Sequence, residues 1–157
     1  ADAVDCAGNR IGDAPSFLLG VAVNPNADDP RHELDRLRRK VDAGAHFAMT
    51  QVFFEWAPWL RFLDLCGGEP PVPTLVAVWP LRSLKLALRL HHEVPGIVVP
   101  EEVLAGLEAA GPDAERVGHD LAAAMLREAP TYAQGAYLIA PFKRPEQVIP
   151  LLDAAEG

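Results

Sequence analysis

The stretch PRHELDRLRRKVDAGAHFAMTQVFF, residues 30–54, joins a helical pattern to a short apolar run and so indicates the fold class. Apolar residues recur at helical spacing in its first part, at Leu34, Leu37 and Val41. Pro30 suits a first helical turn, and Gly44 suits the end of the helix. The run from Phe47 to Thr50 then reads as a strand buried on both faces. The stretch therefore predicts a helix followed by a strand of a parallel sheet.

The same alternation continues along the chain. Five short apolar runs predict five strands: Phe17 to Val23, Phe47 to Thr50, Thr74 to Val78, Gly96 to Val99, and Gly135 to Ile139. Helical patterns separate them, with one inserted helix before the last strand, and a final helix is predicted from about Pro145. Such an order predicts a parallel α/β fold.

Two parallel architectures fit this order. A (β/α)8 barrel of the TIM type uses roughly 30 residues per unit, so 157 residues supply about five of its eight βα units. A doubly wound, flavodoxin-like sheet that binds FMN fits the length as well. Its phosphate loop would follow the first strand, but Asn24 to Asp29 is acidic and contains no glycine.

Composition narrows the function classes. The formal net charge of -8 disfavours nucleic-acid binding, and no apolar run approaches the ~20 residues of a membrane span. Cys6 and Cys66 are far apart, which favours reduced thiols and a cytoplasmic location over a disulfide framework. The small, polar residues 1–16 are predicted to be a linker entered in mid-protein, leaving residues 17–157 as the domain.

Several kinds of catalytic site lack their motifs. The glycines form neither a dinucleotide-binding nor a P-loop pattern, and neither serine lies in a nucleophile elbow. His91 and His92 are adjacent, so on a helix they point about 100° apart, which argues against a shared metal ion. We therefore expect no metal site.

The residues that follow each strand are the best candidates for a binding site, because the active face of a parallel barrel lies there. Gln51 could read the edge of a heterocycle, or it could cap a helix or face solvent. The basic run of Arg36, Arg38, Arg39 and Lys40 could hold a pyrophosphate, or it could complement the dipole at a helix end. The residues alone leave both pairs of alternatives open.

One family shares these motifs. Leu37 to Phe54 resembles the central signature of the methylenetetrahydrofolate reductases, and Phe17 to Pro25 resembles their Gly-Val-Ala-x-Asn-Pro strand end. Trp79 to Lys85 and Val94 to Pro100 follow at the family's spacing, and the resemblance extends from Phe17 to Glu146. The sequences of Asp5 to Asp13 and of His91 to Pro100 are most similar to the reductase domain of bacterial proteins that fuse a homocysteine methyltransferase to this barrel.

The resemblance implies the C-terminal part of a (β/α)8 barrel in a flavoprotein of one-carbon metabolism and methionine biosynthesis. Members hold FAD and use NAD(P)H to reduce 5,10-methylenetetrahydrofolate to 5-methyltetrahydrofolate. Carried over by position, the expected cofactor-binding residues are Glu33, Arg36, Arg39 and Lys40. The expected folate-binding residues are Gln51, Leu90 and Arg144. The family's catalytic acid and its flavin-tuning Asp belong to an N-terminal half, so no catalytic residue is expected in this chain.

A second hypothesis makes the chain a non-catalytic half-barrel. Five βα units would leave open strand edges, which favour self-association or docking on a partner subunit. If the chain is instead part of the reductase, its expected partners are a folate substrate, the N-terminal half of the barrel and, in a homo-oligomer, further copies of the same chain.

Overall fold

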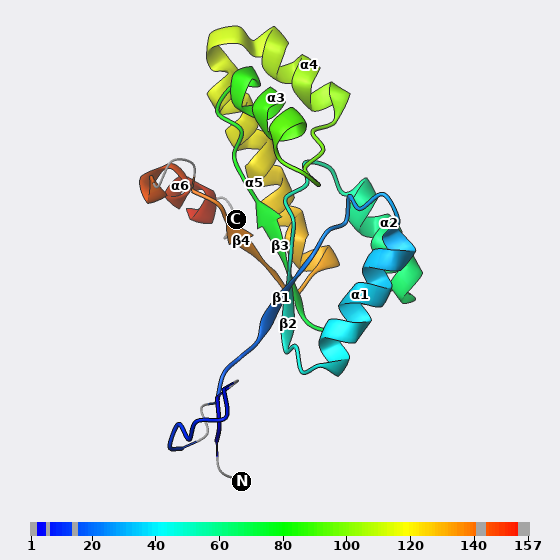
Figure 1. Ribbon diagram of the computed structural model, residues 1–157. Helices are drawn as coiled ribbons and strands as arrows, with labels where there is room; N and C mark the ends of the chain where they lie inside the picture. The colour runs from blue at the N-terminus through cyan, green and yellow to red at the C-terminus, as the bar shows by residue number, and fades with distance from the viewer. Residues whose placement is uncertain (1–2, 6, 14–15, 141–143, 154–157) are drawn as a thin grey trace.

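A computed structural model describes residues 3–5, 7–13, 16–140 and 144–153 (Figure 1). Its main sheet is parallel and has the strand order β1-β2-β3-β4. The strands are β1 (Gly20–Val23), β2 (Phe47–Thr50), β3 (Thr74–Val78) and β4 (Gly135–Leu138). Each strand therefore pairs with the next one along the chain, as in a barrel of βα units.

Helices connect and cover the strands. They are α1 (Pro30–Asp42), α2 (Ala57–Cys66), α3 (Leu84–Glu93), α4 (Glu101–Ala110), α5 (Ala114–Tyr132) and α6 (Ile149–Asp153), with 3-10 turns η1 (Gly111–Asp113) and η3 (Pro145–Gln147). In Figure 1, α1 and α2 lie together beside the sheet, α3 and α4 lie beyond the end of β3, and α5 runs back from them alongside β3 and β4. The predicted parallel α/β class is confirmed, and it is consistent with part of a TIM-type barrel.

Helix α1 begins and ends where the local sequence predicts. The Asp29 carboxylate accepts a hydrogen bond from the His32 N–H at 2.9 Å, and Pro30 occupies the first turn. Gly44, two residues after the helix, has a φ of 104°, a conformation that costs other residues more than glycine. These local interactions fix the length of α1, and therefore place its charged face relative to β1.

The core lies between one face of the sheet and helices α1, α2 and α5. Trp59 is fully buried there, and its indole N–H donates to the Tyr132 carbonyl at 3.0 Å, which joins α2 to the end of α5. Burial of a large apolar side chain stabilises a fold by about 1.5 to 3 kcal/mol. The other large members of this cluster are Val23, Leu34, Leu37, Phe53, Phe62, Leu63, Val76, Val78, Met125, Leu126 and Leu151.

The strand predicted over Gly96 to Val99 does not form. Strand β3 pairs directly with β4, for example Val76 with Ala136, so no position remains between them for another strand. Ile97 and Val99 are buried instead in a second apolar cluster, between the α3–α4 connection and the residues that follow β2 and β3. The Val99 N–H donates to His91 Nδ1 at 3.1 Å rather than to a strand. The described residues thus contain four strands, not five.

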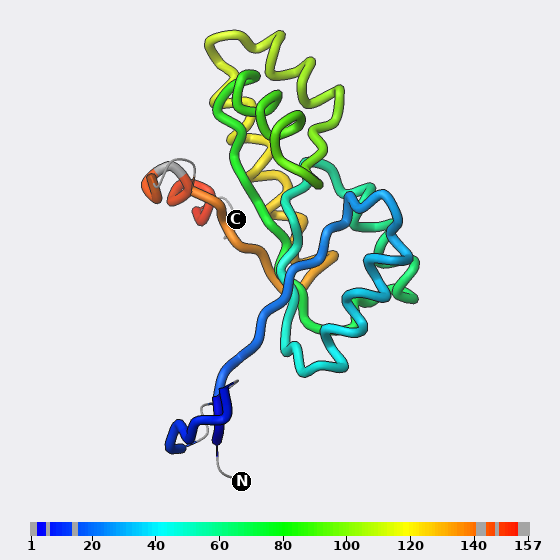
Figure 2. Tube along the Cα trace, viewed as in Figure 1, coloured from blue at the N-terminus to red at the C-terminus, as the bar shows by residue number. Residues whose placement is uncertain are grey.

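The first strand is shorter than predicted. The prediction began it at Phe17, but β1 begins at Gly20, and Phe17 and Leu18 are 70% and 80% exposed. The tube in Figure 2 shows this part of the chain running away from the sheet. No described element covers these side chains, so no buried apolar contact stabilises an extension of the strand toward the N-terminus. The linker predicted over residues 1–16 stays a prediction.

The two faces of the sheet differ. Successive side chains of a strand point to opposite faces, so Val23 and Ala48 point into the helix-covered core while Ala22 and Met49 point the other way. Helices α1 and α2 do not cover this second face, and Tyr137 projects from it as well. The candidate site lies on this face.

Candidate functional site

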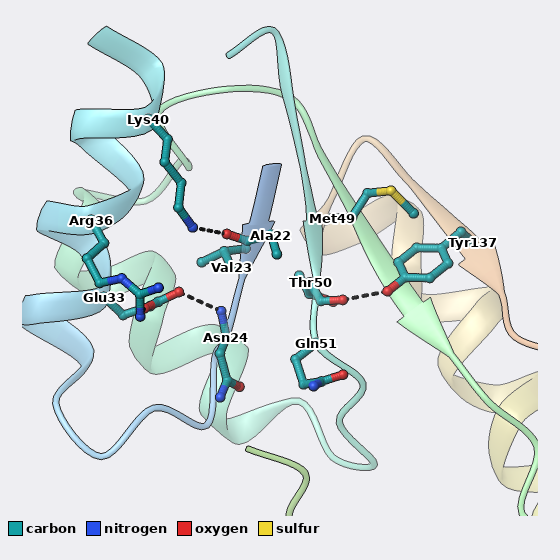
Figure 3. A pocket seen from close by; sticks show the side chains of 10 residues that line it. All are labelled: Ala22, Val23, Asn24, Glu33, Arg36, Lys40, Met49, Thr50, Gln51 and Tyr137. Atoms are coloured by element: carbon teal, nitrogen blue, oxygen red, sulfur yellow. Dashed lines mark hydrogen bonds and ion pairs between the residues drawn. The ribbon is translucent and has the colours of Figure 1, made fainter. Parts of the chain in front are cut away.

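A pocket of about 350 Å³ lies at the carboxyl ends of β1 and β2, between α1 and β4. Figure 3 shows its lining as sticks. Parallel α/β proteins bind ligands at this end of their strands. The pocket brings together four of the residues predicted from the sequence, since its lining is Ala22, Val23, Asn24, Glu33, Arg36, Lys40, Met49, Thr50, Gln51 and Tyr137.

Glu33 provides a buried carboxylate in the wall of this pocket. The residue is only 4% exposed, and its Oε1 accepts a hydrogen bond from the Asn24 N–H at 3.0 Å. Its Oε2 accepts from Arg36 Nη1, also at 3.0 Å. Burial of a carboxylate is tolerated only when such partners compensate for the lost water. Glu33 therefore joins the end of β1 to α1 and holds Arg36 at the pocket.

The cations of α1 continue away from Glu33 along the helix. The Lys40 ammonium donates to the Ala22 carbonyl on β1, next to the pocket. Arg39 is exposed and contributes to a shallow depression with Arg36, Lys40 and Ala43 rather than to the pocket itself. Because Arg36 and Lys40 line both the pocket and this depression, the pocket and the depression share one basic rim. Arg39 and Lys40 also lie in the last turn of α1, so the alternative of a favourable helix-dipole interaction fits equally.

Gln51 lies one residue beyond β2. Its backbone N–H donates to the Val23 carbonyl at 2.7 Å, which continues the pairing of β1 and β2 past the strand end. Its side-chain Oε1 accepts from the Val52 N–H at 3.0 Å. The amide nitrogen donates to none of the described residues, and the side chain lies in the pocket (Figure 3). Gln51 thus caps a local N–H with its oxygen and keeps its two N–H donors for another group.

Tyr137 is the pocket residue that the sequence motifs did not indicate. It lies within β4, whereas the predicted binding residues follow the strands or lie on helices. The Tyr137 hydroxyl donates to the Thr50 carbonyl at 2.6 Å, and partial burial raises the pKa of this phenol. The period-two alternation of β4 was the available signal, because it places Tyr137 on the face opposite Ala136 and Leu138.

Two predicted folate-binding residues lie outside the pocket lining. Leu90 is buried in the second apolar cluster with Ile97 and Val99. Arg144 is exposed at the start of η3, while Lys143, its neighbour in the sequence, lies outside the described residues. A role in folate binding stays a prediction for Leu90 and for Arg144.

The described residues offer no cluster of metal ligands. No group of three or more His, Cys, Asp or Glu side chains suited to a metal ion occurs among residues 3–5, 7–13, 16–140 and 144–153. His91 and His92 meet edge to face at 4.8 Å, with His91 Nδ1 already accepting from the Val99 N–H. Over the same part of the chain, no helix has the length and apolar character of a membrane span.

Comparison with known proteins gives the family. Residues 11–137 match methylenetetrahydrofolate reductase. This chain belongs to the methylenetetrahydrofolate reductase family. The 5,10-methylenetetrahydrofolate reductase of Salmonella typhimurium is 32% identical over 109 residues, which cover 67% of this chain and 36% of that protein. Methylenetetrahydrofolate reductase 2 of Schizosaccharomyces pombe is 28% identical over 116 residues, or 64% of this chain and 18% of that protein.

A solved structure supports the fold. An uncharacterised protein from Clostridium thermocellum that binds two copies of 5-methyl-5,6,7,8-tetrahydrofolic acid superposes with a TM-score of 0.64. The superposition covers 88% of this chain and 52% of that one, at 18% sequence identity. The chain therefore spans about half of this structural neighbour, and it matches little more than a third of its Salmonella relative.

Proposed function

We propose that this chain forms one wall of the cofactor and folate site of a flavin-dependent methylenetetrahydrofolate reductase. The reaction is the reduction of 5,10-methylenetetrahydrofolate to 5-methyltetrahydrofolate by NAD(P)H. The observation that carries the proposal is the convergence of Glu33, Arg36, Lys40 and Gln51 on one pocket. The family resemblance of the sequence predicts all four as binding residues, and they come from two different βα units.

The donor set of the pocket suits FAD. Arg36 and Lys40 offer cationic donors for a diphosphate, and Arg39 extends them along α1. The free N–H groups of Gln51 suit the carbonyl edge of a heterocycle. When bound, FAD supplies the hydride transfer between NAD(P)H and the folate. The part of this chain is then to bind and orient the two ligands.

The proposal assigns the remaining wall, with its catalytic acid, to an N-terminal half of the barrel. The matched region is 36% of the Salmonella relative, and the face that carries Ala22, Met49 and Tyr137 is not covered by α1 or α2. Both observations fit a sheet whose second face completes its site against further βα units. A cytoplasmic location, in keeping with a soluble metabolic enzyme, is part of the same proposal.

The test is flavin retention. The chain is incubated with FAD, freed of unbound dye by gel filtration, and measured by visible absorption, both alone and mixed with the N-terminal part of a bacterial relative. We expect a retained flavin band, in one preparation or both, that Arg39→Ala weakens. Arg127→Ala is the matched control, because Arg127 is an exposed arginine on α5 that lines neither hollow. Absence of the band from both preparations would contradict the proposal.

A non-catalytic half-barrel is the second candidate. Strands β1 and β4 are the outer strands of the sheet, and each has one edge without a partner among the four strands described. Free edges favour pairing with a second copy or with another subunit. Size-exclusion chromatography with light scattering distinguishes the states, because a monomer of 17.0 kDa is incompatible with the self-associated form.

A further inference from the structure

The Tyr137 side chain reaches from its own strand, across the neighbouring strand, to the strand beyond it. It starts on β4, and its hydroxyl donates to the carbonyl of Thr50 on β2 at 2.6 Å, although β3 lies between these strands. The β3 residue in register with Tyr137 is Ala77. Register partners in a parallel pair point to the same face, so the phenol ring passes over the Ala77 methyl group. Ala77 is fully buried, which agrees with this arrangement.

Both ends of the Tyr137 side chain are therefore held. The backbone is paired to β3, and the hydroxyl proton is committed to the Thr50 carbonyl. Strand β2 is itself joined to β3 at this point, because Thr50 Oγ1 accepts from the Ala77 N–H at 3.0 Å. The ring has one face toward β3, and it also lines the pocket (Figure 3). The pocket thus contains a flat apolar surface of fixed orientation.

Gln51 follows Thr50 and lies in the same pocket, with its amide donors uncommitted. A planar ring resting on the Tyr137 face would present its edge to neighbouring polar groups. Aromatic side chains stack on planar heterocycles, and amides read the carbonyl and N–H groups of their edges. The combination selects a fused heterocycle with a pyrimidine-like edge. The flavin ring and the pterin ring share this chemistry.

We propose that Tyr137 is a further ligand-binding residue, whose ring is the surface on which the planar heterocycle of the ligand stacks with its edge toward Gln51. This inference rests on the proposed function. The hydroxyl acts only through Thr50 and donates no proton to the ligand. The ring, rather than the hydroxyl, is what binding requires.

The test uses whichever preparation retains flavin, the chain alone or the mixture, with the tyrosine rings labelled with carbon-13. The chain has two tyrosines, and Tyr132 is an internal reference because it packs against Trp56 at 5.0 Å and does not line the pocket. FAD and 5-methyltetrahydrofolate are titrated separately and followed by NMR. We expect a stacked ring to move the Tyr137 signals upfield and to leave those of Tyr132 in place, and the ligand that does so identifies the ring.

Two substitutions complete the test. Tyr137→Phe keeps the ring, and we expect an affinity within about twofold of the unmodified chain. Tyr137→Leu removes it, and we expect binding to weaken about tenfold, or about 1.4 kcal/mol. Circular dichroism establishes that both variants fold. Retained binding with no movement of the Tyr137 signals, or equal affinities for the two variants, overturns the inference and leaves the proposed function intact. Failure of the unmodified protein to bind either ligand removes the proposed function itself.

Discussion

Replacement of Gly118 by alanine tests the packing of α5 most directly. A Cβ atom built at this position lies 1.7 Å from the Leu81 carbonyl oxygen and 2.6 Å from the carbonyl carbon. Non-bonded heavy atoms normally stay about 3.5 Å apart, so α5 or the segment after β3 must move by more than an ångström. The obstruction is backbone and cannot rotate aside as a side chain could.

Two effects of opposite sign compete at this position. Alanine favours a helix over glycine by about 0.8 to 1 kcal/mol, which stabilises the variant. Overpacking of a close contact costs about 1 to 3 kcal/mol and occasionally more, and here the contact is far inside normal separation. We expect the clash to dominate and Gly118→Ala to lower the free energy of unfolding by about 2 kcal/mol.

The matched control is Gly106→Ala in α4. Gly106 is exposed, lies inside a helix and has no atom within 4 Å of its added Cβ. Only the helix preference remains, so this variant should gain about 0.5 to 1 kcal/mol. Urea unfolding followed by circular dichroism measures both. With an m-value of about 2 kcal/mol per molar urea, the midpoint of Gly118→Ala falls by about 1 M. A Gly118→Ala variant as stable as Gly106→Ala would refute the close approach of α5 to Leu81.

Three further predictions concern the pocket. Glu33→Ala leaves the Asn24 N–H without its acceptor and should lower the free energy of unfolding, measured by urea unfolding, by about 2 kcal/mol. Glu33→Gln keeps an acceptor and should lower it by less than about 1 kcal/mol. Equal losses for the two variants would contradict this role of Glu33. Gly96 has a φ of +80°, and the Cβ of a Gly96→Ala variant would lie 2.5 Å from Asn24 Nδ2. The variant should therefore reduce flavin retention as well as stability. Unchanged retention would show that Asn24 does not shape the pocket. The raised pKa of Tyr137 keeps its phenol neutral after the unfolded chain has ionised, so stability should be full below the ordinary tyrosine pKa and fall as pH rises through the folded value. Urea midpoints measured across alkaline pH check this sign, and Tyr137→Phe should show a smaller fall.

Local patterns predicted the elements whose determinants are near in sequence. Helix α1 has its cap at Asp29 and its apolar stripe within thirteen residues, so its span from Pro30 to Asp42 followed from the chain itself. Strands β2 and β3 also matched their predicted bounds. The location of Gln51 followed in turn, because the end of a buried strand in a parallel fold is the mouth of the site.

The strand predicted over Gly96 to Val99 was wrong because an apolar run indicates burial and does not by itself indicate strand pairing. Ile97 and Val99 are as buried as strand residues, and no property of the run itself excludes a strand. Pairing of β3 with β4 excludes it, and that pairing joins segments separated by the whole of α3, α4 and α5. Leu90 illustrates the same limit, because the family resemblance gave its position in the sequence without indicating which apolar cluster its side chain would join.

By itself, then, the sequence determined the α/β class, the family, and the presence of Glu33, Arg36, Lys40 and Gln51 near the ends of two βα units. Those features depend on spacing within short segments, which periodicity and capping chemistry encode directly. Only the tertiary structure decided the number of strands in the described chain and the position of Tyr137 across Ala77, with its hydroxyl on Thr50. Both depend on hydrogen bonds between residues far apart in the chain, and no local pattern specifies which strand edges will meet.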